Sequence, residues 1–335
     1  MRILLATDAW PPQVNGVVRT LTHLVAELER LGHSVTTLHP GLFATIPCPG
    51  YAEIRLALGA GRRIGAMIEA ARPDAVHIVT EGPIGLAARR WCLRHDHAFT
   101  TAFHTRFPEY LAGRFLMPAR ITYAALRRFH APARGVMVAT PSVARALASR
   151  GFRNVRPWTR GADHERFNPM LRAEDPGFPR PVFLSVGRIA PEKNLAAFLA
   201  LDLPGSKVVV GEGPQLPALR RRFPGVHFLG RRENGRLAEL YASADVFVFP
   251  SLTDTFGLVM LEALASGLPV AAYPAPGPID VIGDSGAGVL DPDLRTAVLA
   301  ALAIPREHCR SHALRFTWRE CARQFLEQLC PVSDK

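Results

Sequence analysis

The sequence predicts an α/β protein made of two doubly wound parallel-sheet domains in tandem. Short apolar runs, typical of buried parallel strands, alternate with longer amphipathic stretches of helical period. A stretch rich in proline and charge interrupts this series at residues 167–181, and the alternation then starts again. The 335 residues are enough for two cores of ordinary size. We therefore expect two Rossmann-like domains that face each other across a central cleft.

We assign residues 1–166 to the first domain. Its first strand is predicted by the apolar run RILLAT (2–7), and a helix is predicted by TLTHLVAELERLGH (20–33), where apolar residues recur at helical spacing before a glycine. The following SVTTLHP (34–40) completes a β-α-β unit. Further strands, with helices between them, are predicted at 75–80, 98–105 and 135–140.

Residues 182–314 are assigned to the second domain, and residues 167–181 to the linker before it. One of its helices is predicted by GRLAELYASA (235–244), and a last helix at 317–329 has no strand after it. The strands of this domain are predicted at 181–187, 206–213, 226–230, 245–251, 268–273 and 288–291.

The net charge of +11 is placed unevenly along the chain. Residues 1–163 hold 21 Arg and no Lys against 10 acidic residues, whereas the remainder holds 19 basic and 19 acidic residues. The excess positive charge indicates anionic substrates, a membrane surface or nucleic acid near the first half. Codon bias is an alternative explanation for 37 Arg against 3 Lys, but it does not explain the asymmetry.

Composition also bounds the class of protein. A hydrophobic content of 48% with a mean hydropathy of +0.09 fits a packed globular protein and argues against a disordered one. Five scattered cysteines without a CxxC pair predict reduced thiols. The chain opens directly with a predicted strand, and no charge-free apolar run reaches the roughly 18 residues that span a bilayer. We expect a cytoplasmic protein, and peripheral contact with the inner face of the membrane stays open.

Charged and glycine-rich loops follow the predicted strands of the second domain, where ligands bind in such folds. The loop in SVGRIAPEKN places Arg188 and Lys193 five residues apart, as a clamp for a diphosphate or, alternatively, as ordinary solvated charges. The glycine turn in VGEGPQ lets backbone approach a ligand, but such turns are common and the signal is weak alone.

The segment PSLTDTFGLVMLEALASG predicts a strand-to-helix connection whose first helical turn lies near Phe256–Val259. The N–H groups of that turn are a ready site for phosphate oxygens. About a turn further in, Glu262 is placed to accept hydrogen bonds from sugar hydroxyls. Two alternatives stay open: Asp254 as a helix N-cap, and Glu262 as a buried acid with an internal partner.

Polar residues also follow strands of the first domain. Asp8 comes after the first strand, and Asn15-Gly16 offers backbone that can approach phosphate at a helix start. His104 lies at the end of the strand at 98–105, where its ring can face the cleft, although a lone histidine is more often structural.

Together these segments resemble the retaining nucleotide-sugar glycosyltransferases of family four, which have the GT-B fold. The resemblance rests on the GRIAPEKN loop, the VGEGP turn, YASADVFVFPS, and the two acids Asp254 and Glu262 with seven residues between them. The segments DAWPPQVNGVVRT, HTRFPEY and RGADHERFNP most resemble the GDP-mannose-dependent α-mannosyltransferases, a branch close to the sulfolipid synthases that use UDP-sulfoquinovose.

The resemblance implies roles for residues of the second domain. Arg188 and Lys193 would bind the donor diphosphate, helped by the first turn that runs through Phe256, Gly257, Leu258 and Val259. Glu262 would hold the ribose hydroxyls, and Asp254 would stand near the donor sugar in place of the family's longer Glu. The nucleobase is expected near Gly230 and Arg231.

It also implies roles in the first domain and at the junction. Gly16 would approach the donor phosphate, and His104 would contact the donor sugar near the reacting carbon. Asp8, Asn15, Arg160 and Asp163 would border the cleft on the acceptor side, and the segment 315–330 would cross back onto the first domain.

The implied activity is that of a retaining hexosyltransferase. It would move an α-mannosyl group from GDP-mannose to a hydroxyl of a lipid or glycan acceptor, with the leaving diphosphate helping to deprotonate that hydroxyl. UDP-glucose or UDP-sulfoquinovose as donor to a diacylglycerol-type lipid is the alternative. No cofactor beyond the donor and no metal is implied, and we interpret the Asp291-Pro292-Asp293 sequence as a turn.

Two other classes of protein fit less well. An NAD-dependent oxidoreductase needs GxGxxG after a strand, and Gly59, Gly61 and Gly65 miss that spacing by one residue. A nucleic-acid-binding protein would suit the basic half, but no recognisable motif is present.

The segment 109–134 mixes Arg with Leu111, Phe115, Leu116, Ile121 and Leu126, which predicts either a basic surface for anionic lipid or a core helix with solvated arginines.

Overall fold

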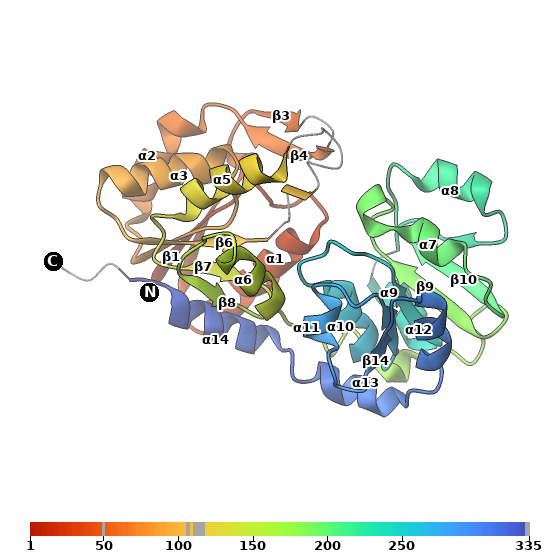
Figure 1. Cartoon of the computed structure of the whole chain (residues 1–335). Coiled ribbons are helices and arrows are strands. Elements are labelled where there is room, and N and C mark those ends of the chain that lie inside the picture. Colours follow the sequence, from red (N-terminus) through yellow and green to blue (C-terminus); the bar gives the residue numbers. More distant parts are fainter. Residues whose placement is uncertain (49–50, 105–107, 110–117, 233, 332–335) are drawn as a thin grey trace. The chain divides into compact units, whose positions relative to one another are not determined.

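The computed structural model describes residues 1–48, 51–104, 108–109, 118–232 and 234–331 of the chain. It divides into two compact units, one comprising Met1–Arg160 with Trp318–Lys335, the other Gly161–Thr317. Each unit has a parallel sheet with helices packed on it (Figure 1). The predicted class, two Rossmann-like α/β domains, is confirmed.

The described residues of the first unit form a six-stranded sheet in the order β2-β1-β5-β6-β7-β8, and every neighbouring pair is parallel. All strands predicted for this half are present. The antiparallel hairpin β3–β4 and the edge strand β8 were not predicted. The strands β3 and β8 have only four and three residues, none of them fully buried. The strands are β1 (Arg2–Ala6), β2 (Ser34–Leu38), β3 (Thr45–Cys48), β4 (Tyr51–Ala57), β5 (Ala75–Ile78), β6 (Phe99–Phe103), β7 (Val136–Val138) and β8 (Val155–Pro157).

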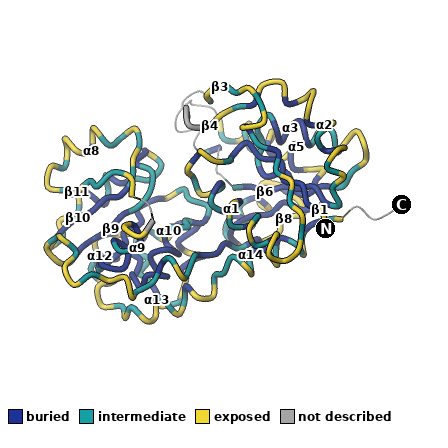
Figure 2. Tube along the Cα trace, turned by 180° about the vertical axis from the view of Figure 1, so that it is seen from behind, coloured by how far each residue is buried: buried dark blue, intermediate teal, exposed yellow. Residues whose placement is uncertain are grey.

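Helices cover both faces of this sheet, and strand alternation decides which side chain meets which helix. In β1, Leu4 packs in one cluster with α2 and α3, whereas Leu5 packs in another with α1 and α14. The central strands β5, β6 and β7 are buried along their whole length, whereas β3 and β8 are not (Figure 2). The helices are α1 (Gly16–Arg30), α2 (Ala60–Ala71), α3 (Pro83–Arg94), α5 (Ala119–His130), α6 (Pro141–Ala148) and α14 (Trp318–Gln328), with the 3-10 turn η1 (Pro40–Leu42).

The second unit repeats the design. Within its described residues the sheet has six parallel strands in the order β11-β10-β9-β12-β13-β14, and all were predicted. The strands are β9 (Val182–Val186), β10 (Ser206–Val210), β11 (His227–Phe228), β12 (Val246–Phe249), β13 (Val270–Ala272) and β14 (Gly288–Leu290). The helices are α7 (Leu195–Leu199), α8 (Leu216–Arg222), α9 (Asn234–Ser243), α10 (Leu258–Ala265), α11 (Pro278–Val281), α12 (Leu294–Ala301) and α13 (Arg306–Ala313), with η2 (Pro169–Leu171) and η3 (Pro191–Lys193).

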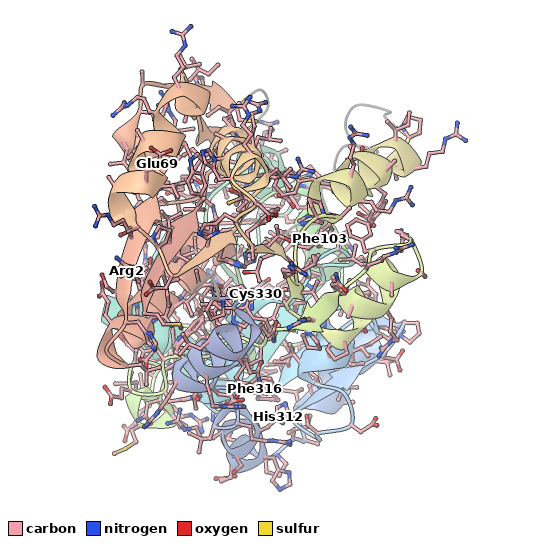
Figure 3. The ribbon with its side chains drawn as sticks, turned by 90° about the vertical axis from the view of Figure 1, so that its left-hand side faces the viewer. Arg2, Glu69, Phe103, His312, Phe316 and Cys330 are labelled. Carbon is pink, nitrogen blue, oxygen red and sulfur yellow. The ribbon has the colours of Figure 1, made fainter. Side chains whose placement is uncertain are left out.

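The structure places the junction earlier than the predicted linker. Residues 161–181 lie inside the second unit, and the chain passes between the units after Arg160 and again after Thr317. Ala162 N donates to Phe316 O at 3.1 Å, and the Phe316 ring lies 5.3 Å from that of His312 (Figure 3). Phe167, which opens the predicted linker, is 1% exposed. Tertiary packing thus overrides the local signal of proline and charge.

Gly85, in the first turn of α3, offers a test of this packing. A β-carbon at Gly85 would lie 1.8 Å from the carbonyl oxygen of Thr80, whereas one at Gly61 in α2 would meet its nearest atom at 3.6 Å. We expect Gly85→Ala to lower the free energy of unfolding by at least about 2 kcal/mol through overpacking. Gly61→Ala should raise it by about 0.5 kcal/mol, because alanine favours helix. Urea denaturation measures both, and equal effects would contradict the packing described.

Candidate functional site

The loops after β9 and β10 in the second unit are packed backbone against backbone. Ile189 N donates to Glu212 O at 2.8 Å. A β-carbon at Gly211 would lie 1.8 Å from Gly187 O, and one at Gly213 would lie 2.4 Å from Ile189 O. The two glycines of the VGEGP turn are therefore required by the neighbouring loop of the same chain, and they hold that loop at the carboxyl end of the sheet.

Lys193 and Asp254, predicted as separate site residues, form an ion pair. Lys193 Nζ lies 2.6 Å and 2.9 Å from the two carboxylate oxygens of Asp254. Ser251 Oγ donates to Glu192 O at 3.1 Å, so side chains of the loop after β12 brace the loop after β9. Because β9 and β12 are neighbours in the sheet, this edge carries a cation held ready beside a carboxylate.

The N-terminus of α10 is the second anion-attracting feature of this edge. Its N-cap is Gly257, with φ +89°, and it supplies no side-chain acceptor. The first-turn amides of Leu258 and Val259 have no acceptor within the helix itself and carry partial positive charge. The alternative that Asp254 is the N-cap is wrong, because its carboxylate pairs with Lys193.

Glu262 is 4% exposed in α10 and has an internal partner. The hydroxyl of Tyr241, a fully buried residue of α9, donates to Glu262 Oε2 at 3.0 Å. This contact supports the alternative in which Glu262 is a buried acid that is hydrogen-bonded to another side chain of the protein. Its role toward ribose stays a prediction. Tyr241 itself was not singled out from the sequence, although it lies in the YASAD segment.

Three further predicted residues lie at the same edge. Arg188 is about one-third exposed, and its Nη1 is 4.0 Å from Glu192 Oε1, so it is a cation at the surface of the β9 loop. Gly230 O accepts from Gly211 N at 2.9 Å, which joins the loop after β11 to the loop after β10. Arg231 follows it and is exposed. Their contacts with a nucleobase stay a prediction.

In the first unit Asp8 serves the fold. Its carboxylate accepts from Ile84 N at 3.0 Å and from the Thr80 hydroxyl at 2.8 Å, so it satisfies the N-terminus of α3. A β-carbon at Gly82 would lie 2.5 Å from this carboxylate. Burial raises the pKa of Asp8, and the hydrogen bonds oppose that shift. Asp8 therefore has a structural role, and its predicted place on the side of the cleft that binds the acceptor substrate stays a prediction.

Asn15 and Gly16 lie at the start of α1. The side chain of Asn15 accepts from Val17 N and Val18 N, each at 3.0 Å, which starts the helix four residues before the predicted position. Gly16 is the first helical residue and is exposed, so its backbone is accessible to a ligand.

His104 and Arg160, far apart in sequence, meet in the first unit. Arg160 is 3% exposed, and its Nη2 lies 3.4 Å from Nδ1 of His104, just after β6. Burial, reinforced by the Arg160 charge, places the pKa of His104 well below its usual range. Asp163 belongs to the second unit, where its Oδ1 accepts from Arg166 N at 3.0 Å and closes a turn. The structure therefore brings together Arg160 and His104 but describes Asp163 with the other unit.

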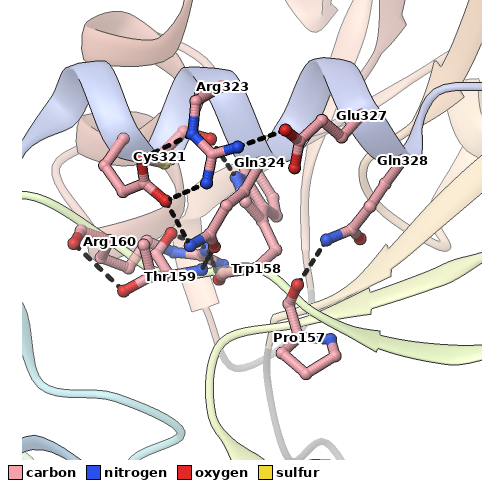
Figure 4. A network of polar contacts seen from close by, with 10 residues as sticks. Pro157, Trp158, Thr159, Arg160, Cys321, Arg323, Gln324, Glu327 and Gln328 are labelled. Carbon is pink, nitrogen blue, oxygen red and sulfur yellow. Dashed lines mark hydrogen bonds and ion pairs between the residues drawn. The ribbon is translucent and has the colours of Figure 1, made fainter.

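Helix α14 supports Arg160, which the sequence alone did not reveal. Trp158 Nε1 donates to Cys321 O at 3.0 Å, and Thr159 N donates to Gln324 Oε1 at 3.0 Å (Figure 4). The first contact joins residues 163 positions apart, so no local pattern could have predicted it.

The Asp-Pro-Asp sequence near the end of the second unit forms a turn, as interpreted. Asp291 Oδ1 accepts from Asp293 N at 2.7 Å, and Asp293 caps α12 through Arg295 N and Thr296 N. Over the residues that the structure describes, no group of three or more His, Cys, Asp or Glu side chains has an arrangement suited to a metal ion.

Comparison with known families assigns both halves of the chain. Residues 180–304 match the profile described as "Glycosyl transferases group 1", and residues 14–166 match the one described as "Glycosyltransferase Family 4". Among solved structures, sucrose-phosphate synthase of Thermosynechococcus elongatus is similar with a TM-score of 0.79 over 97% of both chains, at 21% identity. The HepE protein of Anabaena, solved with UDP and glucose, has a TM-score of 0.72 over 98% of both chains, at 16% identity. These likenesses show the GT-B fold.

Relatives in sequence extend over most of the chain. A GDP-mannose-dependent α-mannosyltransferase of Mycobacterium tuberculosis is 31% identical over 87% of this chain and 84% of its own length. A sulfoquinovosyl transferase of Arabidopsis thaliana is 30% identical over 86% of this chain, which spans 62% of that longer relative. The chain therefore belongs to the family-four glycosyltransferases and is a hexosyltransferase with the GT-B fold.

Proposed function

We propose that this enzyme transfers an α-mannosyl group from GDP-mannose to a hydroxyl of a lipid or glycan acceptor, with retention of configuration. The observation that carries the proposal is the Lys193–Asp254 pair at the sheet edge that also holds the uncapped start of α10. A diphosphate can bind both features, because its oxygens accept hydrogen bonds from the lysine and from the free amides at the helix start. The donor is taken from the relatives, since mannosyltransferases named for GDP-mannose in Mycobacterium tuberculosis and Corynebacterium glutamicum are 31% and 26% identical.

The chemistry then falls mainly to electrostatics. The bond between the anomeric carbon and the diphosphate oxygen breaks as the acceptor oxygen bonds to the same face of the sugar, and the acceptor proton passes to the departing diphosphate. Arg188, Lys193 and the first-turn amides of α10 stabilise the charge that develops on that leaving group. Lys193 turns from Asp254 toward phosphate, which leaves the Asp254 carboxylate available to a sugar hydroxyl. No cofactor besides the nucleotide sugar is required.

A UDP-sugar donor is the second candidate. The sulfoquinovosyl transferase of Arabidopsis is 30% identical, and an alpha-monoglucosyldiacylglycerol synthase of Streptococcus pneumoniae is 28% identical over 94% of this chain. The predicted base site at Gly230 and Arg231 offers mainly backbone, which discriminates poorly between bases. This candidate shares the diphosphate site and differs in base and sugar.

The donor role of Glu262 can be separated from its structural role by two substitutions. Glu262→Gln removes the carboxylate but keeps an oxygen that can accept from Tyr241, so the fold should survive. Loss of a charged hydrogen-bond acceptor for ribose should weaken binding of GDP-mannose at least about tenfold by titration calorimetry. UDP-glucose and UDP-sulfoquinovose, titrated in parallel, show which donor binds the unsubstituted enzyme.

Tyr241→Phe is the matched control, because it removes the internal hydrogen bond and keeps the carboxylate. We expect this variant to be less stable by about 1–3 kcal/mol while donor affinity stays within about twofold. If both variants lose stability and neither loses affinity, Glu262 is a buried internal acid and its donor role is wrong.

We also propose peripheral contact with an anionic membrane, through α5. Within the described residues no helix is long and apolar enough to cross a bilayer. Helix α5 exposes Arg120, Arg127 and Arg128, and Ile121 beside them is 55% exposed, whereas Leu126 is buried in the core. Positive charge with an apolar side chain suits an anionic lipid surface. The segment 110–117, with Leu111, Arg114, Phe115 and Leu116, lies outside the described residues.

The membrane proposal is tested by replacing three arginines of α5. Arg120→Gln, Arg127→Gln and Arg128→Gln together should abolish co-sedimentation with phosphatidylglycerol-containing vesicles, since each basic residue contributes about 1 kcal/mol to such binding. The matched control replaces Arg220, Arg221 and Arg222 of α8, which are also exposed, with Gln. Equal loss in both triple variants, or binding to phosphatidylcholine vesicles alone, would contradict a specific α5 surface.

A further inference from the structure

Arg160 is a buried cation that is held by backbone carbonyls. The guanidinium donates from Nη1 to Trp158 O at 2.6 Å and to Thr159 O at 2.9 Å, and lies 4.0 Å from the centre of the Trp158 ring. In the part of the chain that the structure describes, no carboxylate pairs with it. Burial lowers the pKa of Arg160 to about 10, so the group is still charged at neutral pH. Burying an uncompensated charge is costly, which calls for a functional reason.

Another contact of this guanidinium determines how His104 is protonated. Arg160 Nη2 lies 3.4 Å from His104 Nδ1. A guanidinium has only N–H donors, so the ring nitrogen that faces it has to accept. In a neutral imidazole, an accepting Nδ1 leaves the proton on Nε2. The contact therefore selects the tautomer in which Nε2 carries the hydrogen.

The surroundings of His104 also oppose the charged imidazolium. Among the described residues, the titratable groups that act on it are Arg160 from the segment after β8 and His77 from β5, and Arg160 in turn interacts with the Cys321 side chain of α14. Burial, with the Arg160 charge, lowers the pKa of His77 to about 3, and burial raises the pKa of the Cys321 thiol to about 11. At neutral pH this set holds one positive charge and no negative one, so protonation of His104 is disfavoured.

We propose that Arg160 is a positioning residue that keeps His104 as the neutral Nε2–H tautomer, a hydrogen-bond donor to the nucleotide-sugar substrate. The inference rests on the proposed function for the identity of that substrate. In this tautomer His104 has no free basic nitrogen for the acceptor proton, which instead goes to the departing diphosphate. His104 thus acts through a fixed N–H dipole and not as a general base.

The frame around Arg160 is built to keep this contact in place. Trp158 is fully buried and stacks under the guanidinium, while its indole N–H is tied to Cys321 O of α14. Thr159 N is tied to Gln324 of the same helix (Figure 4). Both carbonyls that accept from Arg160 therefore belong to a segment anchored by the helix that closes the unit.

Long-range 1H–15N NMR of protein labelled in its histidine rings tests the proposal without any substrate. The His104 signals are assigned by their loss in His104→Gln. We expect the unsubstituted enzyme to show the Nε2–H pattern unchanged from pH 5.5 to 8.5. In Arg160→Met both tautomers should appear, and the pKa of the ring should rise because the Arg160 charge is gone, while burial still holds it below the ordinary histidine value. Arg160→Lys, which also offers only donors, should restore the Nε2–H pattern.

Arg89→Met is the matched control for lost packing. Arg89 donates to the carbonyls of Phe129 and Arg128 and lies 5.6 Å from the Phe129 ring centre, but it does not contact His104. The His104 signals of the Arg89→Met variant should match those of the unsubstituted protein. An Nδ1–H or imidazolium pattern at pH 7 in the unsubstituted enzyme, or the same pattern in Arg160→Met, would overturn the proposal.

Transfer kinetics separate this inference from the proposed function. The kcat of the unsubstituted enzyme should be flat from pH 6 to 8, whereas that of Arg160→Met should fall toward low pH over the range in which NMR shows its His104 ring becoming protonated. Absence of transfer from any nucleotide sugar would defeat the proposed function, whereas the NMR patterns would still decide the role of Arg160.

Discussion

The candidate site depends on one constraint, the bracing of neighbouring strand-end loops in the second unit. Gly211 and Gly213 let the loop after β10 lie directly against Gly187 and Ile189, closer than any side chain would permit. The Lys193–Asp254 pair and the Ser251 hydrogen bond then join the loop after β12. A lysine held by a carboxylate is neutral as a pair, so the apo protein avoids a bare cation, and a diphosphate can take the place of the carboxylate.

Several buried or partly buried arginines hydrogen-bond to two or more backbone carbonyls each, and some of them thereby hold separate segments together. Arg160 holds two carbonyls in the first unit, and Arg306 donates to Ala244 O and Ser266 O in the second. Arg310 Nη1 donates to Phe167 O and Ala265 O at 2.8 Å and 2.6 Å. A planar guanidinium can serve several acceptors at once in fixed geometry, which a lysine ammonium does less well. The excess of Arg over Lys therefore has a structural use in this fold, whatever codon bias adds.

The alternation of strands and helices could be predicted because burial on both faces of a parallel sheet leaves a continuous apolar run in the sequence. Boundaries set by side-chain contacts could not. The start of α1 depends on the Asn15 cap, and the place of Phe167 depends on its contact with the distant Tyr241, whose ring centre is 5.6 Å away. Likewise, the sequence suggested an acceptor-side role for Asp8 but not its hydrogen bond with Thr80, which follows β5 and lies 72 residues further along the chain. Residue type and motif order predicted the ligand class, whereas the partners of Asp254, Glu262 and His104 had to come from the structure.

The most direct test of the central claim, mannosyl transfer from GDP-mannose, is a product measurement. The purified enzyme is incubated with an extract of polar lipids and with GDP-mannose, UDP-glucose or UDP-sulfoquinovose, and the glycosylated lipid and released nucleotide are quantified. The account predicts an α-linked mannosyl product with one GDP released per sugar transferred. Transfer from a UDP-sugar alone, or a β-linked mannosyl product, would contradict it.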